Sequence, residues 1–198
     1  MPLSGWLPPM PLAQAALVLD ETAEALRQLE AARPYEPDLH AQGEILREAA
    51  RISAEAGDPA AAAAYLSEAL THLARERDLS AYADAVVALA YTRLRLRQFP
   101  EAIDTFSEAL SVVEQAPNAN PTLIAAVYAD KAAAHETLGQ FPAAADAYRH
   151  ALKRIDLRHD PERWRTLAVA LGRSSAAAGD HQSAVESYFD ALQIEGIP

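Results

Sequence analysis

The chain contains no cysteine, and only seven of its 198 residues are glycine. Without a thiol it can form neither a disulfide framework nor a thiolate metal site, and it has no cysteine nucleophile. Long apolar runs are missing as well, because no stretch approaches the roughly 18 residues that a bilayer-spanning helix needs. These absences argue against a disulfide-rich secreted domain and against a helical membrane protein, so we expect no membrane partner.

Basic residues are also scarce, since 17 lysines and arginines stand against 28 acidic residues and leave a formal net charge of −11. Phosphate backbones are bound through positively charged surfaces, so we expect no nucleic-acid partner. Residues 1–11 hold four prolines and Trp6 but neither a basic segment nor a continuous apolar run. We interpret them as an extended proline-rich arm rather than a secretory signal, which predicts a cytoplasmic protein.

Alanine is abundant, at 46 residues, and this composition favours helices over strands. The 13 prolines lie in the N-terminal arm and at boundaries between periodic segments, where helices tolerate them. Apolar residues at three- and four-residue spacing predict a helix over 12–32, within an N-terminal helix and linker at 12–37. The remainder, 38–198, is predicted to be a domain of repeated helical hairpins, with turns at about 57, 98, 140 and 180. The fold class predicted from these patterns is all-α.

One pattern recurs four times in the second helix of these hairpins. A small residue is followed four positions later by a large apolar residue, and three positions after that by another alanine. The residues are Ala62, Leu66 and Ala69; Ala102, Phe106 and Ala109; Ala144, Tyr148 and Ala151; and Ala184, Tyr188 and Ala191. Small residues let two helices approach to about 8–10 Å, and the large residue fills the groove between them. A single hairpin cannot bury both of its apolar faces, so such units are expected to stack.

This pattern, clearest in KAAAHETLGQFPAAADAY, resembles the tetratricopeptide repeat (TPR) in a long-period variant of about 40 residues. The resemblance covers about residues 43–194. The family's first-helix tryptophan is replaced here, and the positions hold Leu46, Val86, Tyr128 and Ala168. The resemblance implies a right-handed superhelical array of four helical hairpins, preceded by one extra N-terminal helix.

In the TPR family the first helix of each hairpin lines a concave groove that grips an extended peptide or a helix. Helical spacing then predicts ten groove residues: Arg47, Arg51, Asp84, Val87, Tyr91, Arg95, Ala129, Ala133, Val169 and Arg173. Small apolar residues bordered by arginines suit a peptide with apolar and acidic side chains. The resemblance therefore implies a protein–protein interaction module or adaptor with a protein or peptide partner.

Catalytic and cofactor motifs are missing from the sequence. The six histidines form no HExxH pair, and there is neither a glycine-rich phosphate loop nor a GxSxG nucleophile motif. We therefore expect no enzyme activity, no metal and no cofactor. An enzyme or ligand sensor would need a pocket with convergent polar groups, which no sequence constellation indicates.

The C-terminal helix differs from its counterparts because it carries a second apolar stripe, made by Val185, Phe189 and Leu192. Repeat arrays normally end in a polar cap. We hypothesise that this stripe is an oligomer interface, most simply a homodimer contact. The alternative is that the short tail folds back over it. A rival reading of the whole chain is a self-assembling homo-oligomeric scaffold, or a chaperone that holds a client on this face.

Overall fold

A computed structural model describes residues 12–73, 78–115 and 120–193. Within these residues every regular element is helical, which confirms the predicted all-α class. A short 3-10 turn, Arg33–Tyr35, follows the first helix. The α-helices are α1 (Leu12–Ala32), α2 (Leu39–Glu55), α3 (Pro59–His72), α4 (Leu79–Arg95), α5 (Phe99–Val113), α6 (Pro121–Thr137), α7 (Phe141–Leu152), α8 (Pro161–Ala177) and α9 (His181–Gln193).

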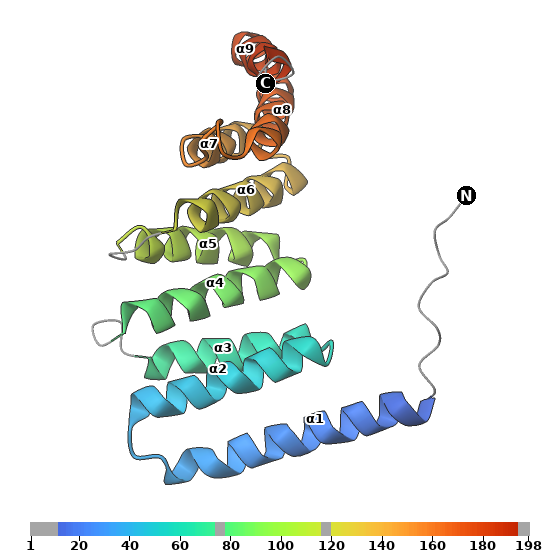
Figure 1. The fold of residues 1–198 in the computed structure, drawn as a ribbon, viewed down its shortest axis with the longest axis vertical. Coiled ribbons are helices and arrows are strands. Elements are labelled where there is room, and N and C mark those ends of the chain that lie inside the picture. The colour runs from blue at the N-terminus through green and yellow to red at the C-terminus, as the bar shows by residue number, and fades with distance from the viewer. Residues whose placement is uncertain (1–11, 74–77, 116–119, 194–198) are drawn as a thin grey trace. The chain divides into compact units, whose positions relative to one another are not determined.

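The chain divides into two compact units, Met1–Ala74 and Arg75–Pro198. In the first unit α2 and α3 form a hairpin, and α1 packs on α2. In the second unit α4 to α9 follow one another in chain order, and each helix packs on the next (Figure 1). The predicted arm at 1–11 lies outside the described residues. The division into arm, N-terminal segment and repeat domain, and the right-handed superhelix, stay predictions.

Polar caps and prolines fix where these helices begin. The carboxylate of Asp58 accepts hydrogen bonds from the backbone N–H groups of Ala60 and Ala61 at the start of α3. Asn120 caps α6 in the same way, and Asp160 caps α8. Proline follows each of these caps, where its fixed φ suits the first turn of a helix.

The four predicted hairpin turns share one backbone geometry. Gly57, Gly139 and Gly179 have φ of 84°, 69° and 85°, and Arg97 has φ of 59°. Two amides close each turn: at the third, the N–H of Gly139 donates to the Glu136 carbonyl and the next N–H donates to the His135 carbonyl, both at 2.9 Å. This is the Schellman arrangement, which satisfies the last carbonyls of the first helix. Glycine adopts it without strain, so Arg97 is the exception among the four.

The repeated pattern of small and large residues forms the core between paired helices. In α5, Ala102, Phe106 and Ala109 are each 0 % exposed. The equivalent residues of α3 and α7 are also buried. In α9 the two alanines are buried, but Tyr188 is 37 % exposed. The pattern therefore predicts packing inside each hairpin correctly, whereas burial of the large residue also requires a following helix.

None of the described helices is long and apolar enough to cross a membrane.

Candidate functional site

A groove of about 840 Å³ lies on the second unit, between α6 and α8 and against α7 and α9. Its apolar lining comes from Ala129 and Ala133 of α6, Leu167, Val169 and Ala170 of α8, and Ala191 and Leu192 of α9. Its polar lining comes from Asp130, Tyr148, Arg165, Thr166, Arg173 and Tyr188. The groove thus combines a floor of small apolar residues with a charged rim.

Four of the ten predicted groove residues meet here: Ala129, Ala133, Val169 and Arg173. All four come from the first helices of the last two hairpins, α6 and α8. Spacing on the first helices did not indicate Asp130, Tyr148 or the residues of α9. Leu192, which the sequence suggested for an oligomer interface, also lines this groove.

The predicted residues of α4 do not line this groove. Asp84 and Arg95 are exposed, whereas Val87 and Tyr91 are half-buried and pack against the core around Phe106. The Tyr91 ring meets the Phe106 ring edge to face, with centroids 5.3 Å apart. Tyr91 therefore contributes to packing, a role that its position on a predicted groove face did not indicate.

The two predicted residues of the first unit are held in ion pairs along α2. Arg47 pairs with Glu44 at 3.5 Å. Arg51 pairs with Glu48 at 2.5 Å and with Glu55 at 2.6 Å. The side-chain hydrogen bonds from Arg51 lower the pKa of Glu48 below its ordinary value. Such exposed pairs on one helix contribute little to stability, and a binding role for Arg47 and Arg51 stays a prediction.

Glu136 of α6 connects three helices and contacts two side chains that line the groove. Its carboxylate accepts hydrogen bonds from Arg173 at 2.8 and 3.2 Å, from the Ser174 hydroxyl at 2.6 Å and from the Tyr148 hydroxyl at 3.2 Å. Burial pushes the pKa of Glu136 upward, but these hydrogen bonds and the Arg173 charge outweigh it and hold the pKa below its usual value. Burial and the neighbouring Glu136 raise the pKa of Tyr148 to about 12. Glu136 therefore fixes Arg173 and Tyr148, two of the groove's polar side chains.

Asp130, also on α6, is half-buried in the groove wall. Burial raises the pKa of its carboxyl group, while the Tyr91 hydroxyl and the positive charge of Arg163 act in the opposite direction. The same environment raises the pKa of Tyr91, through burial first and the Asp130 charge second. Asp130 is thus a partly dehydrated carboxylate beside an apolar floor.

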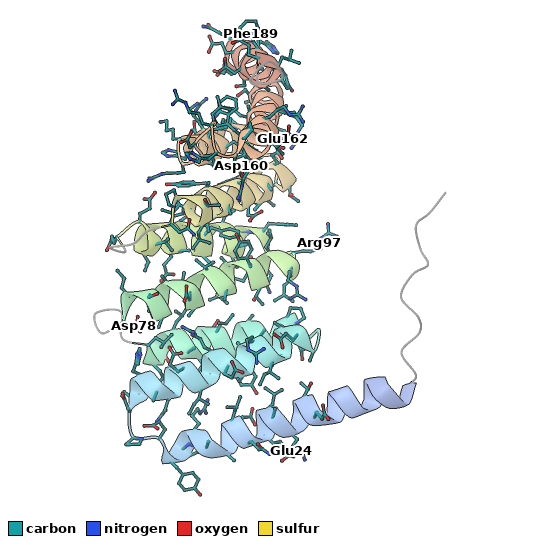
Figure 2. All side chains as sticks on the ribbon, viewed as in Figure 1. Glu24, Asp78, Arg97, Asp160, Glu162 and Phe189 are labelled. Atoms are coloured by element: carbon teal, nitrogen blue, oxygen red, sulfur yellow. The ribbon has the colours of Figure 1, made fainter. Side chains whose placement is uncertain are left out.

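The second apolar stripe of α9 lies at the surface. Val185 is 67 % exposed, Phe189 59 % and Leu192 68 %. Figure 2 marks Phe189 on this helix. Leu192 belongs both to this stripe and to the groove, so the two surfaces are continuous.

The described residues include no group of three or more histidine, aspartate or glutamate side chains placed to hold a metal ion. Two charged side chains of the groove, Arg165 and Arg173, form ion pairs with Glu162 and Glu136.

Comparison with known proteins identifies the repeat. Residues 82–155, which span most of α4 together with α5, α6 and α7, match the family model of the tetratricopeptide repeat. This part of the chain belongs to the tetratricopeptide repeat family. TPR proteins are in general protein-interaction modules. No curated protein matches the sequence.

Solved structures share the fold at low sequence identity. The chain resembles MamA with a TM-score of 0.62 and 19 % identity, over 94 % of this chain and 95 % of MamA. It resembles the TPR-like repeats of a putative kinesin light chain from Podospora anserina with a TM-score of 0.66 and 17 % identity, over 92 % and 93 % of the two chains. It resembles BtubC from P. vanneervenii with a TM-score of 0.59 and 20 % identity, over 93 % of this chain and 90 % of BtubC. These likenesses show the fold alone.

Proposed function

We propose that this TPR protein is a non-catalytic interaction module, or adaptor, which binds a peptide or a helix of another protein in the groove between α6 and α8. The observation that carries the proposal is the groove itself. It places a floor of small apolar residues from two successive first helices beside fixed charged side chains. Recognition of a protein segment needs both features, because apolar burial supplies affinity and placed charges supply specificity.

The groove is also preorganised. Glu136 holds Arg173 through two hydrogen bonds and holds Tyr148 through a third. A side chain that is fixed before binding loses less conformational entropy when the partner arrives. The floor residues lie on helices, which position them more rigidly than loops would.

A random 12-residue peptide library displayed on phage tests this proposal. The library is selected against the wild-type protein, against Val169→Glu, which places a charge on the apolar floor, and against Ser107→Glu. Ser107 is exposed on α5 and does not line the groove, so its variant controls for added negative charge. We expect enrichment on the wild type and the Ser107 variant and its loss on Val169→Glu. Equal enrichment of the same peptides on all three proteins would contradict groove binding.

The exposed stripe on α9 favours a second candidate, a homo-oligomeric scaffold or client-holding chaperone that uses its C-terminal face. Three large apolar side chains on one helix each leave more than half of their surface in water. The simplest occupant is the same face of a second copy. Sedimentation of the wild type and Phe189→Glu at tens of micromolar tests this candidate, which predicts a dimer that the substitution dissociates. If both proteins were monomeric, the homo-oligomeric scaffold would be excluded.

A further inference from the structure

The charges around the groove are paired except at one position. Arg173 pairs with Glu136 at 2.8 Å, and Arg165 pairs with Glu162 at 2.6 Å. Asp130 is the one acidic side chain that lines the groove, and no ion pair joins it to another residue in the described part of the chain. The charge of Arg163 acts on Asp130 from α8, but Arg163 does not line the groove.

Asp130 also has an unusual setting for an aspartate. Its neighbours in the groove include Ala129 and Ala133 on its own helix and Ala170 on α8. A carboxylate that has lost part of its hydration and has no bound cation gains more from a cationic partner than an exposed one does. The Tyr91 hydroxyl and the charge of Arg163 also act on this carboxylate, but the three alanines of the groove lining leave room for such a partner on the groove side.

Resting on the proposed function, we propose that Asp130 determines the specificity of the groove: it receives a lysine or arginine side chain of the bound segment. A large apolar side chain next to that cation then covers Ala133, Val169 and Ala170. The aliphatic stem of the lysine or arginine lies along the alanine floor while its charge reaches the carboxylate. The net charge of −11 favours the approach of a basic segment over long range. This chemistry differs from the acidic peptide that exposed arginines suggest, because Arg165 and Arg173 already have carboxylate partners.

The same phage library tests this inference with two further proteins, Asp130→Asn and Asp146→Asn. Asp146 lies on α7, its side chain is 72 % exposed and it does not line the groove, so it is a matched control. Peptides enriched on the wild type should carry lysine or arginine close to a large apolar residue. The most enriched peptide is then synthesised with lysine and with norleucine at the basic position, and its Kd is measured by fluorescence anisotropy at 50 and 150 mM salt.

We expect Asp130→Asn to raise the Kd of the lysine peptide roughly tenfold, with a larger increase at low salt than at high salt. The norleucine peptide should bind both proteins equally, and Asp146→Asn should match the wild type. Circular dichroism verifies that each variant is folded.

The outcomes separate this inference from the proposed function. Two outcomes would overturn the role of Asp130 and leave groove binding intact. In the first, the enriched peptides need an intact Val169 but show no preference for basic residues. In the second, they bind Asp130→Asn as tightly as the wild type. Enrichment of acidic peptides would overturn it as well. Failure of any peptide to be enriched, or enrichment that Val169→Glu leaves unchanged, would overturn both.

Discussion

Helices α5 and α9 carry the same repeated pattern, yet the structure treats their large residues differently. Phe106 of α5 is 0 % exposed, whereas Tyr188 of α9 is 37 % exposed. Leu110 is buried at 5 %, whereas its counterpart Leu192 is 68 % exposed. Helix α5 packs on both α4 and α6, whereas the main packing partner of α9 among the described helices is α8.

This difference shows that the pattern encodes two separate interactions. The alanines fix the contact within a hairpin, and they are buried in both helices. The large residue and the following leucine need the next hairpin as well. An apolar surface is therefore expected wherever a repeat array has no following helix, and it is available for recognition. Among the described helices, α5 accordingly contributes its apolar residues to the core, whereas α9 leaves part of its apolar residues at the surface.

The largest expected effect comes from removing the two equivalent aromatic rings. Phe106→Ala should lower the free energy of unfolding by about 3–5 kcal/mol, because a fully buried ring leaves a cavity. Tyr188→Ala should cost roughly 1–2 kcal/mol, since part of this side chain is already in water. Urea unfolding followed by circular dichroism measures both. Equal losses would mean that α9 is covered in solution.

A second comparison concerns two glycines in first helices. A Cβ at Gly43 would lie 2.8 Å from Leu73 Cγ and 3.2 Å from the Leu73 backbone nitrogen, and Leu73 is buried. A Cβ at Gly172 would lie 2.8 Å from the ring of the half-exposed Tyr188. Gly43→Ala should therefore destabilise by roughly 1–3 kcal/mol through overpacking.

Gly172→Ala should be near neutral, because the Tyr188 ring can turn toward solvent and alanine favours the helix by roughly 1 kcal/mol. Thermal unfolding of the two variants in parallel checks this order. A loss at Gly172 as large as that at Gly43 would show that Tyr188 is fixed in place.

The sequence predicted the hairpins and their turns because both depend on local signals. Alanine spacing, proline at helix starts and glycine at positive φ act within one or two turns of chain. The groove was predicted only in part, since Asp130 lines it beside Ala129 although spacing selected the alanine alone. Tyr148 and Leu192 reach it from second helices, and no pattern in the first helices indicates that. The second apolar stripe of α9 was predicted from the sequence, because Phe189 stands where the other three copies have the polar residues Ser67, Ser107 and Arg149.

A third prediction concerns how the last hairpin is attached to the one before it. Glu136 of α6 holds Arg173 and Ser174 of α8, and the pKa of its carboxyl group is lowered in the folded protein. Its contribution to stability is therefore fully present above the ordinary glutamate pKa of about 4.3, and it is lost as the pH falls through the folded value. Glu136→Gln should lose roughly 1 kcal/mol at pH 7 and less at acidic pH.

Urea unfolding of the wild type and this variant between pH 3 and 7 measures the difference. The two stability curves should converge as the pH falls below about 4.3. Parallel curves would show that the carboxylate charge does not stabilise this junction.

The smallest effect is expected at the turns, where the position with positive φ is Arg97 in the second hairpin and Gly179 in the fourth. Gly179 adopts φ of 85° without strain, whereas Arg97 holds φ of 59° at a cost of about 1–2 kcal/mol for a residue with a Cβ. Arg97→Gly removes that strain. It also adds flexibility to the unfolded chain, at about 0.5–1 kcal/mol, and loses the contact of the guanidinium with the Phe99 ring, whose centroid is 6.0 Å away.

The net result for Arg97→Gly is a gain of about 0.5 kcal/mol or less, visible as a small rise in Tm. Arg97→Ala separates the contributions, because alanine keeps the strained backbone and loses the ring contact. It should be less stable than the wild type, and Arg97→Gly should exceed both. If alanine and glycine gave the same Tm, the positive φ at this turn would carry no strain, and the glycines at the other three turns would be interchangeable with other residues.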